Sequence, residues 1–419
     1  MATIKEFSAI RPKKGLEDRI AALPYDVYSR EEAREKVKGD SYTFLRIDRP
    51  ETQYPEDYDM YAPEVYRTAH DMLWEMVANG DFVKDETECY YVYEQMMDGR
   101  FQTGIVAVSA VDDYLNNKIK KHENTREDKE IDRINHVDVC NAQTGPIFLT
   151  YRKDNIIHDE IVRAKKEEPI YDFTSDDGIG HKVWMISSKS SITKIREQFE
   201  KIDKIYIADG HHRCASAVKV CLKRRAVNPQ YTGKEDFNFF LSVLFEDEQL
   251  MIMDYNRVVK DLNGLSKEEF LNNVGNSFFI EPVEAVESTE ENDSAKYKPA
   301  KKGTFGMYLE NKWYQLTYKG TSTKDPVKDL DVSILQDYLL NPVLGIQDPK
   351  TDKRIDFVGG IRGMKELERR VHTDSKVAFS MYPTGIHELF AVADAGMLMP
   401  PKSTWFEPKL RSGLFIHKI

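Results

Sequence analysis

The chain has 419 residues, of which 41% are hydrophobic and 31% charged, a composition typical of a folded protein with two or three domains. Its formal net charge of −11 counts against a general electrostatic grip on nucleic acid or on an anionic membrane, while small anions remain candidate ligands. The four cysteines form no C-x-x-C pair and match neither a disulfide framework nor a zinc knuckle. No stretch approaches the ~20 apolar residues of a membrane helix or contains a signal core, so we expect a cytoplasmic protein that does not enter a membrane.

The first part of the chain combines a rigid extended segment with two helices. Residues 22–27 read as extended because Pro24 restricts the backbone, and a helix is expected to open near Ser29 with acidic residues in its first turn. Residues 63–79 form an amphipathic pattern that predicts a second helix. Asp26 lies close to the rigid proline and is a candidate general base.

A β-hairpin and then a polar stretch follow. Residues 89–95 and 101–111 are rich in strand formers and flank a turn at 97–100, which predicts a hairpin. The chain then becomes strongly polar, and a helix is expected over 127–141 with Thr125 as its natural cap.

The polar stretch contains a dense set of chemical groups. His122-Glu123-Asn124-Thr125 supplies an imidazole, a carboxylate, an amide and a hydroxyl in one loop with basic neighbours. Glu123 is the candidate general base towards a substrate hydroxyl, and His122 would orient it or contact a phosphate. An exposed helix entry capped by Thr125 fits the same residues.

Strands and helices alternate through the middle of the chain. This alternation, with hairpins mixed in, predicts an α+β or mixed α/β domain. The expected strands are 147–151, 170–173 and 182–187, and the expected helices are 157–167 and 191–201.

The stretch from 204 to 217 predicts a strand, a tight turn and a helix. The free amides and positive dipole end of a helix attract anions, and two histidines and an arginine stand in this first turn. Gly210 would let a ligand approach the backbone, and the planar fork of Arg213 suits phosphate oxygens. These residues predict a phosphate site formed by Asp209, Gly210, His211, His212 and Arg213.

A structural interpretation of the same stretch remains open. Asp209 would then be an N-cap, Gly210 a turn residue, and the three basic residues solvated side chains. Against this interpretation, consecutive basic residues at a helix start are electrostatically unfavourable unless an anion binds there.

The last third of the chain predicts a second, smaller α+β domain. We expect a first domain over 1–246 and a second over 247–419, the latter with an exposed acidic segment at 282–302. The elements expected around and within it are sheet at 237–245 and 249–258, a helix opening at Ser266 with Glu269 as its capping-box partner, a hairpin of 304–309 and 312–318, and a helix at 331–344.

Two further stretches in this part are candidates for binding. Residues 355–363 repeat the order of strand, glycine turn and helix, but match neither the Rossmann nor the Walker pattern, which favours a structural turn. Residues 400–409 are rich in proline, aromatic and basic residues. Lys402, Ser403 and Thr404 would help to close a pocket, or the segment is a loop packed by its aromatic side chains.

The pattern of metal-binding residue types is weak. His211 and His212 are adjacent and point in different directions, and no H-E-x-x-H motif is present, so a dedicated zinc site is not expected. Neither haem nor flavin has a sequence signal. Mg²⁺ held by a nucleotide and one carboxylate, Asp209, is compatible with the sequence.

Four motifs carry a resemblance to a known family. Over nearly its whole length the chain resembles a widespread prokaryotic family labelled as a domain of unknown function. The motifs are Leu23-Pro24-Tyr25-Asp26-Val27, Lys121-His122-Glu123-Asn124-Thr125, Ala208-Asp209-Gly210-His211-His212-Arg213 and the stretch from Pro400 to Leu410.

A more distant resemblance points to a function. Asp209-Gly210-His211-His212-Arg213 is similar to the phosphate-binding signature of the ParB/sulfiredoxin superfamily, which includes a free-serine kinase. The resemblance implies a ParB/sulfiredoxin-like nucleotide-binding core in which the two histidines and Arg213 contact phosphates. It also implies that Gly210 gives clearance and that Asp209 helps with Mg²⁺ or loop geometry.

The leading hypothesis is a nucleotide-dependent small-molecule kinase that converts free L-serine to phosphoserine. Mg²⁺ with ATP or ADP is the expected cofactor, with CTP as a further donor, and a homo-oligomer is compatible with the sequence. The alternatives are a nucleotide-binding regulator with a ParB-like switch, or a phosphohydrolase that uses the same anion site. The acidic net charge of the chain counts against a nucleic-acid partner.

Overall fold

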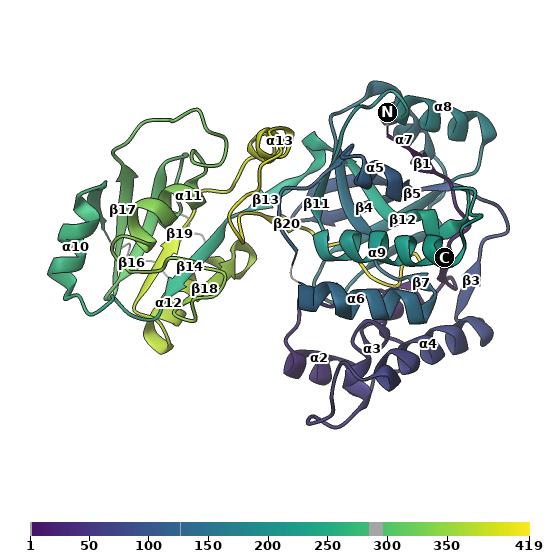
Figure 1. The fold of residues 1–419 in the computed structure, drawn as a ribbon, viewed down its shortest axis with the longest axis horizontal. Helices are drawn as coiled ribbons and strands as arrows, with labels where there is room; N and C mark the ends of the chain where they lie inside the picture. The colour runs from purple at the N-terminus through teal and green to yellow at the C-terminus, as the bar shows by residue number, and fades with distance from the viewer. Residues whose placement is uncertain (1, 126, 285–295) are drawn as a thin grey trace. The chain divides into compact units, whose positions relative to one another are not determined.

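The computed structural model describes residues 2–125, 127–284 and 296–419 of the chain (Figure 1). It divides into two compact units, of which unit 1 comprises Met1–Leu250 with Pro408–Ile419 and unit 2 comprises Met251–Glu407. The expected domains, 1–246 and 247–419, stay a prediction. Among the residues described, no helix is long and apolar enough to cross a membrane.

The C-terminal segment departs from a simple division into two consecutive domains. Strand β21 (His417–Lys418) pairs with β7 (Ala142–Gln143) of unit 1, and Ile416 forms a bridge with Ile10. The end of the chain therefore belongs to unit 1. No local sequence pattern predicts this pairing, because the two segments lie far apart in the sequence.

Unit 1 is built on a nine-stranded mixed sheet. Its strands follow the order β6-β11-β8-β12-β5-β4-β10-β9, with β1 added beside β5. The β11–β6 and β12–β8 pairs are parallel, and the other pairs in this sheet are antiparallel. The strands of unit 1 are β1 (Ile4–Lys5), β2 (Ile10–Pro12), β3 (Phe82–Lys84), β4 (Tyr90–Met97), β5 (Arg100–Ala110), β6 (Ile119–Lys120), β7, β8 (Ile147–Tyr151), β9 (Tyr171–Thr174), β10 (Gly180–Ile186), β11 (Ile205–Asp209), β12 (Phe239–Glu246) and β21.

Helices pack on this sheet and on one another. Figure 1 shows α9 and α6 side by side, with α4 next to α6, and these neighbours are in contact. The helical segments of unit 1 are α1 (Glu17–Ile20), α2 (Arg30–Val37), α3 (Leu45–Asp48), η1 (Pro50–Gln53), α4 (Pro63–Ala78), α5 (Val111–Leu115), α6 (Glu127–Cys140), α7 (Asn155–Ala164), α8 (Lys189–Phe199), α9 (His211–Val227), η2 (Asp236–Asn238) and η3 (Asp247–Gln249).

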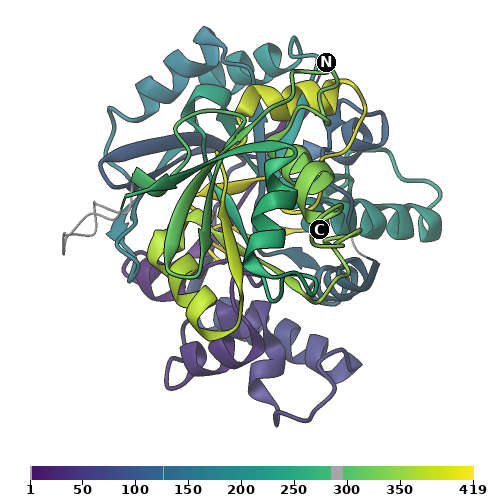
Figure 2. The same ribbon diagram turned by 90° about the vertical axis from the view of Figure 1, so that its left-hand side faces the viewer.

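Unit 2 contains a six-stranded antiparallel sheet in the order β15-β17-β16-β19-β14-β18, whose strands face the viewer in Figure 2. A separate two-stranded pair joins β13 (Met251–Met253) to β20 (Trp405–Glu407). The other elements are β14 (Tyr255–Val259), α10 (Lys267–Gly275), β15 (Phe278–Val283), β16 (Thr304–Leu309), β17 (Lys312–Tyr318), α11 (Asp331–Leu335), η5 (Gln336–Leu340), β18 (Ile355–Gly359), η6 (Gly360–Arg362), α12 (Gly363–Thr373), β19 (Val377–Ser380) and α13 (Ile386–Asp394).

The expected α+β, mixed α/β class is confirmed, and so are many local elements. Ser29 caps α2, and Ser266 with Glu269 forms the capping box of α10. The hairpin of β16 and β17 has the expected bounds. Within the acidic segment expected at 282–302, residues 285–295 lie outside the described part of the chain.

One helix differs from its expected form. In place of a single α-helix over 331–344, α11 passes into a π-helical turn, in which the Asn341 N–H donates to the Gln336 carbonyl over 2.9 Å. Pro342 follows immediately and has no N–H with which to continue a regular helix. The Gln336 side chain donates to the Ile346 carbonyl and so stabilises the loop that follows.

Candidate functional site

The predicted strand, turn and helix are β11, Gly210 and α9. Gly210 has φ 90° and ψ 31°, a left-handed conformation that glycine adopts without a steric penalty. A Cβ at this position would lie 3.2 Å from the Arg213 guanidinium. Glycine therefore permits both the turn and the close approach of the arginine.

The strand before the turn and the helix after it pack in one hydrophobic core. Ile205 and Ile207 of β11 pack in the same core as Cys214 and Ala217 of α9. The pairing of β11 with β8 shifts register between Ile207 and Asp209, and such an irregularity re-aims the residues that follow it. The position of Asp209 relative to the helix start is therefore set by the core.

The Asp209 carboxylate lies among cations. Its Oδ2 atom is 3.3 Å from Lys409 Nζ and 3.9 Å from an Arg213 guanidinium nitrogen. Burial alone would raise the pKa of Asp209, but Lys409 and Arg213 more than offset this effect and hold the pKa below its usual range. The carboxylate is therefore charged at neutral pH, and 34% of its side chain is exposed.

Arg213 is anchored by the backbone of another segment. One guanidinium nitrogen donates to the Pro146 carbonyl over 2.6 Å, which orients the planar fork. The side chain also lines a cavity of about 30 Å³, together with Tyr25 and Arg133. This volume holds about one water molecule, so the guanidinium is held in a closely packed setting.

Two histidines meet at the start of α9. The rings of His122 and His211 are 4.5 Å apart and perpendicular, and both side chains are buried. Burial lowers the pKa of His122 to about 4, and burial together with His122 lowers the pKa of His211 well below its usual value. Both rings are therefore neutral near pH 7, so His211 adds no positive charge to the helix start.

The loop before α6 brings Glu123 to the same place. Its Oε2 atom lies 3.9 Å from His211 Nδ1, and 36% of its side chain is exposed. Asn124 is exposed, and the Thr125 hydroxyl contacts the Glu130 carboxylate. The expected general base and the expected phosphate site are thus neighbours in the folded chain.

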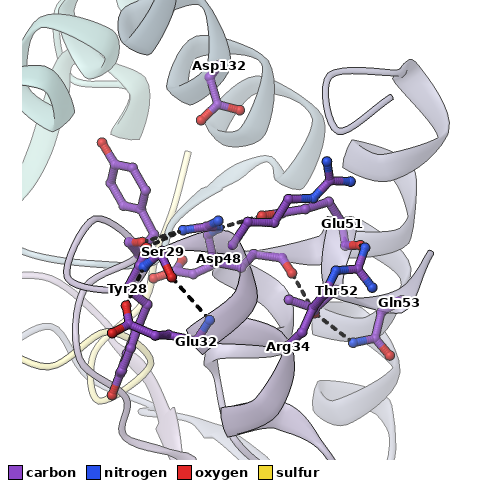
Figure 3. A network of polar contacts seen from close by, with 12 residues as sticks. Tyr28, Ser29, Glu32, Arg34, Asp48, Glu51, Thr52, Gln53 and Asp132 are labelled. Atoms are coloured by element: carbon purple, nitrogen blue, oxygen red, sulfur yellow. Dashed lines mark hydrogen bonds and ion pairs between the residues drawn. The ribbon is translucent and has the colours of Figure 1, made fainter. Parts of the chain in front are cut away.

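Two arginines hold the backbone and the tyrosine ring of the segment that contains Asp26. Arg49 donates to the carbonyls of Tyr25 and Tyr28, each over 2.9 Å. Figure 3 shows Tyr28 within this network of polar contacts. The Arg133 guanidinium lies 4.1 Å from the centre of the Tyr25 ring. Asp26 itself is exposed and follows this anchored tyrosine, which lines the cavity beside Arg213.

Lys402, Ser403 and Thr404 belong to unit 2. The Ser403 hydroxyl donates to the Pro400 carbonyl over 2.6 Å, and the Thr384 hydroxyl donates to the Ser403 carbonyl over 2.9 Å. Lys402 has φ 60° and lies over the Tyr255 ring. These contacts shape a turn within unit 2.

Sequence reasoning did not single out Lys409 as a site residue. The sequence did offer a signal for it, because Lys409 follows Pro408 near the end of the fourth family motif. The chain re-enters unit 1 at that proline, and the Lys409 carbonyl then accepts a hydrogen bond of 2.8 Å from the Gln95 amide. This contact helps to fix the lysine that reaches Asp209.

The site offers few ligands of its own to a metal ion. Across residues 2–125, 127–284 and 296–419, no group of three or more His, Cys, Asp or Glu side chains is arranged to hold one. Mg²⁺ is commonly held by one or two carboxylates together with substrate phosphates. The partly exposed Asp209 carboxylate fits that limited role.

Comparison with known proteins identifies a family. The family model described as "Protein of unknown function (DUF1015)" matches residues 4–333, and the chain belongs to this family. The expected membership of a family of unknown function is therefore confirmed over residues 4–333, and the fourth motif, from Pro400 to Leu410, lies outside the matched residues. A comparison with curated proteins gave no match.

Similarity to solved structures is weak. A free serine kinase in complex with AMP has 14% identity and a TM-score of 0.33, over 72% of this chain and 86% of that chain. SbnI from Staphylococcus aureus, truncated at its C-terminus, has 12% identity and a TM-score of 0.36, over 72% and 82%. A conserved hypothetical protein from Pyrococcus furiosus has 15% identity and a TM-score of 0.33, over 74% and 93%.

Proposed function

We propose that this member of the DUF1015 family is a nucleotide-dependent kinase of a small molecule, with free L-serine as the acceptor. The observation that carries the proposal is the gathering of Arg213, Lys409 and the Glu123 carboxylate around the glycine turn between β11 and α9. The similarity of the Asp209–Arg213 motif to that of a free-serine kinase supports the choice of acceptor.

The nucleotide phosphates would bind at the start of α9. The first backbone N–H groups of a helix have no partner within the helix, and its dipole favours a negative charge there. Arg213 would supply a forked donor held by the Pro146 carbonyl, and Lys409 would supply a second cation. His211 and His212 would complete the phosphate contacts, with His211 as a neutral donor.

Glu123 would take the proton from the acceptor hydroxyl. Phosphoryl transfer depends chiefly on positioning and charge neutralisation, so one well-placed carboxylate base is sufficient. Glu123 is partly exposed and lies beside His211 at the proposed phosphate site. Asp26 is the alternative base, and Asn124 and Thr125 would contribute to the pocket.

Mg²⁺, when bound with the nucleotide, would neutralise charge on its phosphates, with Asp209 as the protein carboxylate nearest to them. Lys409 and Arg213 would hold that carboxylate in its ionised form.

Phosphorus NMR of the purified protein tests the reaction. Mg²⁺ with ATP, ADP or CTP is supplied in turn, with and without L-serine. A phosphomonoester that forms only with serine establishes the kinase and identifies its donor. Inorganic phosphate without an acceptor indicates a phosphohydrolase, and nucleotide binding without turnover indicates a regulator.

A matched pair of variants ties the result to the site. Arg213→Lys keeps the charge but loses the fork, so phosphate transfer should fall by about 100-fold or more. Arg224→Lys lies on the same helix, where the native side chain contacts Asp138, and should leave turnover unchanged. Equal activity of the two variants would contradict the role of Arg213.

A further inference from the structure

A second cavity lies in unit 1, apart from the residues of the phosphate site. It has a volume of about 400 Å³ and is lined by side chains of α7, by the first residues of β5 and by the end of β12. Pockets for small organic ligands begin at about 300 Å³, so this cavity is large enough for one. The side chains that give it chemical character are Phe101, His158, Ile161, Val162, Lys165 and Glu246.

Glu246 is the most deeply buried charged group of this cavity. Only 1% of the residue is exposed, and its Oε2 atom lies 3.0 Å from His158 Nδ1. Its Oε1 atom is buried and has no hydrogen-bond partner in the described part of the chain. A buried carboxylate oxygen without a donor is unfavourable, so this atom would accept a hydrogen bond from a ligand.

The electrostatics of Glu246 point to a cationic donor. Burial raises the pKa of its carboxyl group, and His158 offsets this effect only in part. An ammonium group placed at Oε1 would supply the missing positive charge and a hydrogen bond together.

The cavity also has a cation and an apolar wall. The Lys165 ammonium contacts the Glu94 carboxylate, and as a group with three donors it has further capacity for an anion. Phe101 and Val162 are 55% and 43% exposed, and Ile161, which is buried, lines the same cavity. These three residues would shield an aliphatic or aromatic group from water.

We infer that this cavity binds an α-amino acid with an apolar side chain. Its ammonium group would bind Glu246, its carboxylate Lys165, and its side chain would pack against Phe101, Ile161 and Val162. The three parts of such a ligand match the acid, the cation and the apolar wall that line one cavity. The inference does not depend on the activity proposed for the phosphate site.

Calorimetric titration of the full chain tests the ligand class. The probes are L-leucine, 3-methylbutylamine, which lacks the carboxylate, and 4-methylpentanoate, which lacks the ammonium. Leucine should bind, and each analogue should bind at least about tenfold more weakly because it loses one charged contact. Absence of leucine binding at about 10 mM, or an analogue that binds as tightly as leucine, would overturn the inference.

Variants place the ligand in this cavity. Val162→Asp changes an exposed position of α7, so the protein should fold, and it should weaken leucine binding at least about tenfold. Val227→Asp is the matched control, because Val227 is exposed on α9 and should leave binding unchanged. Glu246→Gln should also weaken binding, whereas Glu248→Gln should not, since Glu248 pairs with Lys153 at the surface. Full leucine affinity in both Val162→Asp and Glu246→Gln would overturn the assignment of the cavity.

Discussion

Lys409 Nζ lies 3.3 Å from Asp209 Oδ2, although 200 residues separate the two in the sequence. The contact joins the returning C-terminal segment to the end of β11, at the turn that precedes α9. It keeps the Asp209 carboxylate ionised and places an ammonium group at the proposed phosphate site. The C-terminal segment is therefore part of the candidate site.

Replacing Lys409 should weaken nucleotide binding. In Lys409→Met the Asp209 carboxylate loses a cation and would repel the phosphates, so ADP affinity should fall about tenfold or more. Lys418→Met is a matched control in the same segment, since Lys418 lies over the Trp74 ring. Calorimetric titration with ADP measures both variants. Equal affinities would show that Lys409 does not contact the nucleotide.

Replacing Glu123 should separate chemistry from binding. Glu123→Gln keeps the size of the side chain but removes the base, so kcat for phosphoserine formation should fall about 100-fold or more. The affinity for the nucleotide should change by less than about twofold. Asp26→Asn is the comparison, and it should leave kcat nearly unchanged. The reverse pattern would assign the base to Asp26, and full activity in both variants would exclude a carboxylate base at these positions.

Gly210→Ala should impair the site beyond its cost in stability. The left-handed φ of 90° penalises any side chain, and we expect a loss of about 1–2 kcal/mol in unfolding free energy. The new methyl group would also displace the Arg213 guanidinium, which lies 3.2 Å away, and reduce ADP affinity.

Gly80→Ala provides the control for this prediction. Gly80 has a similar φ of 80°, and a Cβ there meets no atom within 4 Å. Urea denaturation and ADP titration of both variants should show similar stability losses and a binding loss in Gly210→Ala alone. A binding loss in both would attribute the effect to general destabilisation.

Asp331 should make stability depend on pH. Burial raises the pKa of its carboxyl group to about 7 from an ordinary value of 3.8, although the Gly303 N–H donates to it. Between about pH 4 and pH 7 the folded chain therefore holds a proton that the unfolded chain has released. This group's contribution to stability falls as pH rises through that window, by at most roughly 4 kcal/mol.

Asp331→Asn removes this titration and keeps an oxygen for the Gly303 N–H. The variant should gain stability relative to the original chain as pH rises from 5 to 8. Urea denaturation of both proteins at several pH values in this range measures the difference. Parallel stability curves would show that Asp331 is ionised in the folded chain without a significant penalty.

The sequence by itself determined the local elements. The caps Ser29 and Ser266, the hairpin of β16 and β17, and the turn at Gly210 depend on residues a few positions apart, and each was predicted from such residues. The α+β class followed from their alternation. The residue types that predict a phosphate site likewise stand together in one short motif, Asp209 to Arg213.

Only the tertiary structure decided which distant groups meet. Glu123 reaches His211, and Lys409 reaches Asp209, because the loop before α6 and the beginning of the returning C-terminal segment both lie close to the start of α9. Burial against His122 also makes His211 neutral, although its sequence neighbours suggested a cluster of positive charges. Charge state and proximity depend on packing between segments far apart in the chain, and periodicity and composition carry no information on that packing.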